Sequence, residues 1–289
     1  MTGLLRADFL KMRKRWMPYV LFVLMLVGAA FLIWAIGYST WHDDDDPEWS
    51  ASGFRTFAFP YSIPALLDSG QFWGSAIFVG ILATSTLATE HNWGTVRPAL
   101  AGGVSRARYL ASKLLVLTLV STVALLTALA FGVLLSLWAT SVAGFDAPVP
   151  HPESFTAADL ALMILRTALA IIPYGLIAFT FTVLSRSTAL GIAGTMGYMV
   201  LEAIIVEVQG TGGGIFEHVR VLFIGHNVTA LIAENQFDNL EYESMAFRDL
   251  GSSVPGVWSA TFIIIAESAL LLAASFFVFL HRDVTVSHG

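Results

Sequence analysis

Long apolar runs constrain this 289-residue chain more than any other feature. The hydrocarbon core of a bilayer is about 30 Å thick, and about 20 apolar residues in a helix cross it. Inside that core every backbone N–H and C=O must be bonded within the protein, so such a run predicts a helix. We therefore predict an all-α integral membrane protein, with one transmembrane domain over residues 1–289 and six membrane-spanning helices. Their approximate ranges are 17–40, 71–90, 110–142, 158–184, 188–208 and 257–281.

The composition supports this class and excludes others. Hydrophobic residues make up 56% of the chain and charged residues 12%, whereas about a quarter of the residues of a soluble domain are charged. The absence of cysteine excludes a disulfide framework and a thiolate metal site. The first apolar run is too long for the core of a cleavable signal peptide, so we expect it to remain as a membrane anchor.

The lysine and arginine residues predict the orientation of the chain. Of the 15, eleven fall on one side of the predicted membrane, three on the other, and Arg166 within a span. Cytoplasmic segments carry the excess of basic residues, so both termini are predicted to lie in the cytoplasm of a multi-pass cell-membrane protein. The eleven are Arg6, Lys11, Arg13, Lys14, Arg15, Arg97, Arg106, Arg108, Lys113, Arg186 and Arg282.

The segment 1–16 predicts an amphipathic helix that lies on the membrane surface. Apolar side chains fall on one side of this helix and most basic side chains fall elsewhere, which is typical of a segment bound to anionic lipids. A plain basic anchor ahead of the first span is the simpler interpretation, and the two are compatible. The apolar side chains are Leu4, Leu5, Phe9, Met12 and Trp16.

Two longer segments are predicted on the outer side of the membrane. The segment 41–70 contains the acidic run Asp43–Asp46, which lacks the glycine and the distal glutamate of an EF-hand loop and is interpreted as a solvated loop. The segment 209–256 contains apolar stretches at 219–224 and 228–233. These stretches are too short to cross a bilayer, so we expect them to form re-entrant or surface-lying helices.

A polar, basic and glycine-bearing island separates the second and third spans, at 90–113. Gly94 allows a tight turn just below the membrane. Thr95 and Ser105 are favourable N-cap residues. They predict a short helix over 96–102 and a third span that starts just after Ser105.

Glu90 is the acidic residue of this island. Glu90 could accept hydrogen bonds from the turn, or pair with Arg97 or Arg106. A basic loop that merely obeys the orientation rule explains the arginine and lysine residues, but it does not explain Glu90, Gly94 and Thr95. We therefore favour a segment on which a soluble partner exerts force.

The same island resembles the hallmark of ABC-2 type permeases, the membrane subunits of one large class of ABC exporters. In that family an acidic residue ends the second span, and Gly-Thr, a basic residue and a small-apolar run follow. A Ser-Arg pair then leads to a lysine that opens the third span. A proline usually precedes the Ser-Arg pair; here Gly102-Gly103-Val104 stands there, and a proline occurs instead at Pro98. The matching positions are Glu90, Gly94, Thr95, Arg97, Leu100, Ser105, Arg106 and Lys113.

This resemblance implies a transport subunit, not an enzyme, that exports an amphipathic compound, a peptide, a lipid-like molecule or an ion. The sequence contains no Walker A motif, so ATP and Mg²⁺ would bind to a separate ATPase subunit. Two permease copies, identical or different, would work with two ATPase subunits. Membrane lipids are expected partners, and no nucleic acid, metal or cofactor is expected on this chain. The residues implied in coupling to the ATPase are Glu90, Gly94, Thr95, Arg97, Ser105, Arg106 and Lys113.

Four ionisable residues fall inside the predicted spans: Arg166, Glu202, Glu207 and Glu267. Charged groups inside a bilayer are costly and are usually paired or functional. Arg166 and Glu202 have comparable predicted depths and could form an ion pair. Alternatively, Glu202 and Glu207 line the outer part of a translocation path. Glu267, near mid-depth, could be protonated or face a neighbouring helix.

Buried glutamates would also suit a proton-coupled secondary transporter, which is the alternative function. Such a transporter usually shows internal repeats, and we find none in the sequence. A membrane-embedded enzyme has no support, since the chain lacks a His-Glu-x-x-His motif, paired membrane aspartates and a serine–lysine dyad.

The fifth predicted span carries three glycines at three-residue intervals, Gly191, Gly194 and Gly197. Small residues on one face of a membrane helix allow a second helix to approach closely. The contact could lie within the chain or between two copies, and packing within the chain is the simpler explanation.

Overall fold

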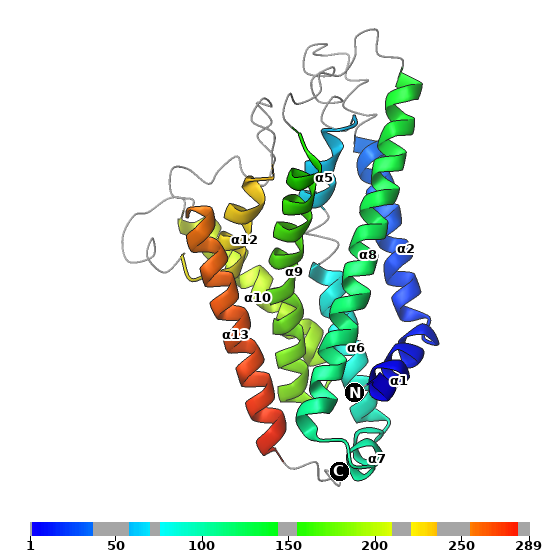
Figure 1. Ribbon diagram of the computed structural model, residues 1–289. Coiled ribbons are helices and arrows are strands. Elements are labelled where there is room, and N and C mark those ends of the chain that lie inside the picture. Colours follow the sequence, from blue (N-terminus) through cyan, green and yellow to red (C-terminus); the bar gives the residue numbers. More distant parts are fainter. Residues whose placement is uncertain are drawn as a thin grey trace.

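The computed structural model describes residues 2–36, 58–69, 76–143, 155–209, 221–235 and 255–282, and these residues are helical apart from short turns (Figure 1). The acidic run Asp43–Asp46 lies outside the described residues. The elements are α1 (Thr2–Arg13), α2 (Met17–Ala30), the π-helical segment η1 (Phe31–Ile36), α5 (Ser62–Ser69), α6 (Ala76–Asn92), α7 (Val96–Ala101), α8 (Arg106–Ala143), α9 (Ala157–Ser185), α10 (Thr188–Gln209), α12 (Ile224–Ala233) and α13 (Val257–His281).

Four helices of the described residues are long and apolar enough to cross a membrane, in agreement with a multi-pass integral membrane protein. They cover Met17–Ala35, Arg106–Val142, Ala157–Ser185 and Val257–His281. The two other predicted spans correspond to α6 and α10. Helix α6 has 17 described residues, and α10 has 22 residues, among them Glu202 and Glu207.

Helix α8 is far longer than a bilayer requires. Its 38 residues extend over about 57 Å at about 1.5 Å per residue, whereas the hydrocarbon core measures about 30 Å. Its upper end extends beyond the neighbouring helices in Figure 1. The apolar run predicted at 110–142 is therefore part of one continuous helix.

Helix α9 is the centre of the bundle. Helices α6, α10, α12 and α13 all pack against it, while α1 and α2 pack against α8 (Figure 1). The largest apolar cluster joins α6, α8 and α9 through side chains such as Leu82, Leu110 and Phe179, each less than 2% exposed. Removal of this apolar surface from water stabilises the packing of these helices wherever the bundle is in contact with water.

The apolar side chains of α1 do not form one membrane-facing stripe. Met12 is 6% exposed and packs into the main apolar cluster, whereas Phe9 is 44% exposed. Trp16, which follows α1 and precedes α2, is 76% exposed. The reason is that α1 lies against α8 and also buries Asp8. Contacts with α8 therefore hold this segment in place, and its composition also suits the membrane surface.

Two of the three glycines in α10 are packing positions. A Cβ atom on Gly191 would lie 2.2 Å from Thr182 Oγ1 and 2.5 Å from Thr84 Cγ2, and one on Gly194 would lie 2.7 Å from the Phe181 ring. A Cβ atom on Gly197 would meet no heavy atom within 4 Å. Packing within the chain therefore accounts for Gly191 and Gly194, and Gly197 does not share their contact.

Substitution of these glycines by alanine is expected to have opposite effects on stability. Gly191→Ala should destabilise the protein by about 1–3 kcal/mol, because the added methyl group overpacks the contact with Thr84 and Thr182. Gly197→Ala should be neutral or stabilising by up to about 1 kcal/mol, because alanine restricts the unfolded chain. Apparent Tm values of the purified variants in detergent measure both effects. Equal Tm values for the two variants would contradict the tight α6–α9–α10 contact.

Candidate functional site

A tight turn joins α6 to α7 at the end of the molecule that also contains α1. Gly94 has a φ of +66°, a conformation that glycine adopts without steric cost. The Thr95 N–H donates to the Glu90 carbonyl at 3.0 Å, and its hydroxyl donates to the same oxygen at 3.3 Å. Thr95 thus precedes the predicted short helix but binds back to α6, since it makes no side-chain cap on α7.

The second turn joins α7 to α8 and agrees with the predicted cap. The Arg108 N–H donates to Ser105 Oγ at 3.4 Å, so Ser105 is the N-cap of a helix that begins at Arg106. Gly103 has a φ of +86°. The glycine pair that replaces the usual proline therefore supplies a left-handed residue that reverses the chain after α7.

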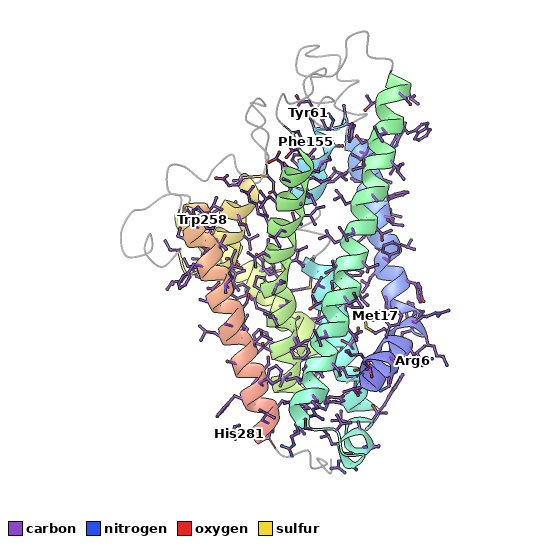
Figure 2. All side chains as sticks on the ribbon, in the orientation of Figure 1. Arg6, Met17, Tyr61, Phe155, Trp258 and His281 are labelled. Carbon is purple, nitrogen blue, oxygen red and sulfur yellow. The ribbon has the colours of Figure 1, made fainter. Side chains whose placement is uncertain are left out.

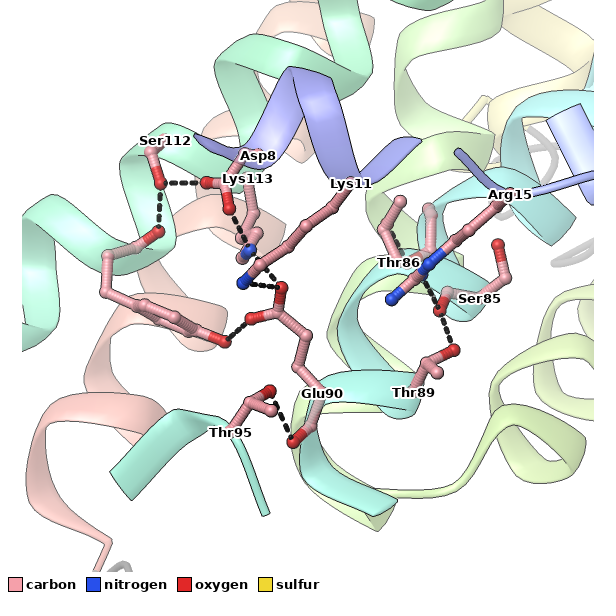
Figure 3. A network of polar contacts seen from close by, with 12 residues as sticks. Asp8, Lys11, Arg15, Ser85, Thr86, Thr89, Glu90, Thr95, Ser112 and Lys113 are labelled. Carbon is pink, nitrogen blue, oxygen red and sulfur yellow. Dashed lines mark hydrogen bonds and ion pairs between the residues drawn. The ribbon is translucent and has the colours of Figure 1, made fainter. Parts of the chain in front are cut away.

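The Glu90 carboxylate is buried, and it is held by residues from two other helices (Figure 3). Lys113 Nζ on α8 donates to Oε1 at 2.7 Å, and Lys11 Nζ on α1 donates to the same oxygen at 2.9 Å. The Tyr109 hydroxyl donates to Oε2. Glu90 thus accepts hydrogen bonds from the turn, as predicted, through its carbonyl. Its carboxylate pairs with the two lysines and the tyrosine, while the predicted partner Arg106 donates to the Leu280 carbonyl.

Asp8 is the second carboxylate of this cluster, and sequence reasoning missed it. Lys113 Nζ donates to Asp8 Oδ1, and Ser112 Oγ donates to Oδ2 at 2.7 Å. Asp8 is 3% exposed, Glu90 3% and Lys113 5%. One signal was available: Asp8 is the only acidic residue in the basic segment 1–16.

The charges of this ionic cluster, which we define as Asp8, Lys11, Glu90 and Lys113, balance. Two carboxylates face two ammonium groups, and Lys113 contacts both carboxylates while the Lys11 side chain remains 47% exposed. Removing charges from water costs several kcal/mol per ion unless partners and hydrogen bonds compensate. Because each acid has at least two donors, the cluster fixes α1, α6 and α8 in one arrangement.

Three arginines form further contacts between helices at the end of the molecule that contains the ionic cluster. Arg15 Nη1 donates to the Ser85 carbonyl of α6 at 3.2 Å, and its guanidinium lies 5.3 Å from the centroid of the Trp93 ring. Arg106 Nη1 donates to the Leu280 carbonyl at 2.7 Å. Arg282 donates to the Leu184 carbonyl. The last two contacts place cations at the carbonyl ends of α13 and α9, where the helix dipole favours positive charge.

His91 follows Glu90 at the end of α6. Burial lowers the pKa of its imidazole, the cations Arg186 and Arg282 lower it further, and the Glu90 carboxylate opposes the shift. The ring lies 6.4 Å from the Phe279 ring of α13. This lowered pKa favours the neutral imidazole, which packs within this end of the bundle.

Exposed side chains gather on α7 and the turn before it. Trp93 is 68% exposed, and Arg97 and Pro98 are also exposed. Of the seven residues predicted to couple to an ATPase, Glu90 and Lys113 are buried in the ionic cluster, while Arg97 lies at the surface. Gly94, Thr95, Ser105 and Arg106 determine the two turns and the attachment to α13.

The predicted ion pair between Arg166 and Glu202 is wrong. Arg166 Nη1 donates to the Glu234 carbonyl at 2.7 Å, and its Nη2 lies 4.0 Å from Glu234 Oε2. Glu202 Oε1 instead accepts the backbone N–H of Gly225. Gly225 is in the first turn of α12, so the unpaired N–H groups and the dipole of that helix compensate the carboxylate.

The two remaining glutamates of the predicted spans are Glu267, whose side chain the structure describes, and Glu207, whose side chain it does not. Glu267 Oε2 is buried, and no described residue forms a hydrogen bond with it. The side chain of Glu207 lies outside the described part of α10. Across residues 2–36, 58–69, 76–143, 155–209, 221–235 and 255–282, no three His, Asp or Glu side chains form a group that could hold a metal ion.

The apolar helices and the ionic cluster at one end define a multi-pass helical membrane protein in which a turn, the short helix α7 and a second turn connect α6 to α8. Residues 4–202 match the family model described as ABC-2 family transporter protein. The match covers more than half of the chain and includes every residue of the ionic cluster, so the chain belongs to the ABC-2 family of transporter membrane proteins, whose permease domains are typically non-catalytic. The comparisons with curated proteins and with solved structures found no match.

Loss of Lys113 is expected to destabilise the bundle strongly. Lys113→Met leaves Asp8 without its ammonium partner, and breaking a buried ion pair in this way costs about 3–5 kcal/mol. Adding Asp8→Asn should recover part of the loss, because the stranded charge is removed while the pair of Lys11 and Glu90 remains. Apparent Tm in detergent measures each variant.

The exposed Lys14 provides the control for this experiment. Lys14→Met should change the apparent Tm little, since a surface charge contributes about 0–1 kcal/mol. A double variant no more stable than Lys113→Met alone would show that Asp8 is not the charge that Lys113 compensates.

Proposed function

We propose that this chain is the transmembrane permease subunit of an ATP-driven ABC transporter, and that it exports an amphipathic compound, a peptide, a lipid-like molecule or an ion. ATP and Mg²⁺ bind to a separate ATPase subunit in this proposal. Membership of the ABC-2 family supports it. The observation that carries it is the ionic cluster, which joins α1 to α6 and α8, the two helices that flank the exposed helix α7.

In this proposal α7 is the docking element and the ionic cluster transmits its movement. The surface residues Trp93 and Arg97 contact the ATPase, while Glu90 and Lys113 stay buried and hold α6 and α8 to α1. A push on α7 then moves three helices together, because buried ion pairs do not slide freely past one another. Glu90→Ala would consequently disturb the bundle, so surface variants test docking more directly.

We further propose six spans with both termini in the cytoplasm, so that α6 and α10 complete the set begun by the four long apolar helices. The ends of α1 and α13 lie at the same end of the molecule as α7, which suits an even number of crossings (Figure 1). Figure 2 labels Arg6 and His281 at that end, and Tyr61, Phe155 and Trp258 at the other. The orientation rests on the excess of lysine and arginine at the first end.

Helix α12 is a re-entrant helix in this topology. It is too short to cross a bilayer, yet eight of its ten residues, Ile224–Ala233, are buried against its neighbours. The Asn227 side chain donates to the Val221 and Phe223 carbonyls at 2.7 and 2.9 Å. Non-helical backbone at membrane depth requires hydrogen-bond partners within the protein, and Asn227 provides one for each of these two carbonyl groups.

The working assembly is expected to contain two permease copies, identical or different, and two ATPase subunits. The test is isolation of the tagged chain from its native membranes in mild detergent. A soluble subunit should co-purify, and the complex should hydrolyse ATP with Mg²⁺. Transport by the reconstituted chain alone, driven by a proton gradient without ATP, would instead establish the proton-coupled alternative.

Two surface variants test the docking element in this complex. Trp93→Ala and Arg97→Glu should each weaken binding of the ATPase by about thirty-fold or more, as the loss of an interface hot spot of about 2 kcal/mol does. Co-purified ATPase and its titration onto the immobilised permease measure the loss.

Trp258→Ala provides a matched control at the opposite end of the molecule. Trp258 is 87% exposed, and its removal should leave ATPase binding unchanged. Equal effects of Trp93→Ala and Trp258→Ala would exclude α7 as the docking element.

A further inference from the structure

A cavity of about 440 Å³ lies between α9, α10, α13 and the residues at the start of α12. Its wall is mostly apolar, with Phe181, Leu222 and Leu270 among the lining side chains. Small-molecule sites are commonly apolar cavities of about 300–1,000 Å³ with a few placed polar groups. The volume and the lining are therefore those of a site for a drug-sized molecule.

Glu267 is the one charged side chain among the described residues that line this cavity. It lies ten residues after Val257 in α13, or about 15 Å along a helix of 25 residues. That position is close to the middle of the span, where an ionisable group is costly unless it has a partner or a function.

The other polar groups of the wall already have partners within the protein. The Thr180 hydroxyl donates to the Leu176 carbonyl at 2.7 Å and lies 2.9 Å from Ser275 Oγ. The Tyr198 hydroxyl accepts the Ile224 N–H at 3.2 Å. Glu267 Oε2, by contrast, has no hydrogen-bond partner among the described residues. The carboxylate of Glu267 is thus the one polar group of the wall that keeps an oxygen without a partner among the described residues.

The cavity also opens at the side of the helix bundle. Leu222 is 65% exposed and Leu270 is 70% exposed, so both lie at the side of the helices that faces lipid in the proposed topology. A molecule that reaches this opening must first dissolve in the bilayer. An apolar body is then required for access, and a cationic group is required to complement Glu267.

We propose that this cavity binds an amphipathic molecule that consists of an apolar ring system and a single protonated amine. The ring system occupies the apolar wall near Phe181 and Leu270, and the ammonium group pairs with the Glu267 carboxylate. Binding at this site does not depend on the proposed function. Only the identification of such an amine as the transported molecule rests on it.

The test measures binding of three fluorescent probes to the purified full chain in lipid nanodiscs, with empty nanodiscs subtracted. Naphthylmethylamine, naphthylmethanol and naphthylacetate share one ring and carry a positive, no and a negative charge. The amine should bind about ten-fold or more tightly than the alcohol, as expected for one charge-assisted hydrogen bond. The acetate should bind most weakly.

Three variants assign the effect to the cavity. Glu267→Gln should remove the preference for the amine, whereas Glu234→Gln should preserve it, since the Glu234 side chain is 53% exposed and does not line the cavity. Leu270→Trp should weaken the amine and the alcohol alike by filling the opening. Because Leu270 is exposed, this variant does not depend on repacking the bundle.

Three results would overturn the proposal. Equal binding of amine and alcohol by the unmodified chain would show a groove for apolar molecules such as lipid chains. Tighter binding of the acetate would show an anion site. Amine binding that survives both Glu267→Gln and Leu270→Trp would place the site elsewhere. ATPase co-purification is unaffected in each case, so a failure here is distinct from a failure of the proposed transporter function.

Discussion

The contact on which the rest of the structure depends is the buried Lys113 ammonium between the carboxylates of Asp8 and Glu90. It joins α8 to the N-terminal helix on one side and to the end of α6 on the other. The two turns around α7 can then be short, because their ends are already fixed. An apolar contact could hold the same helices, but it would not define their relative rotation as narrowly as three directed ion pairs do.

Glu202 illustrates a second way to bury a carboxylate in this chain. No cation is needed, since the first turn of α12 offers backbone N–H groups and the positive end of its dipole. Glycine at position 225 is required for this approach, because a Cβ atom there would lie 2.9 Å from the Glu202 carboxyl carbon. The α10–α12 contact is therefore built around the carboxylate.

Local features were predictable from the sequence, while partners distant in the chain were not. Gly94, Ser105 and the start of α8 at Arg106 follow from turn and cap chemistry, which involves neighbours a few residues apart. The partners of Glu90 and Arg166 lie on helices whose rotation a hydrophobic pattern does not define. The predicted membrane depths of Arg166 and Glu202 are similar and suggested that the two residues pair. The rotation of each helix about its own axis instead directs Arg166 towards Glu234 and Glu202 towards α12. Asp8 was overlooked for the same reason.

The unbroken length of α8 has a mechanical consequence. Lys113, near the start of α8, is fixed in the ionic cluster, and the helix continues from there to Ala143 over about 45 Å at about 1.5 Å per residue. A rod that pivots near one end converts a small angular change there into a larger linear displacement at the other end. A tilt of about five degrees at Lys113 therefore carries the far end of α8 through several ångström, with no bend and no broken backbone hydrogen bond along the way.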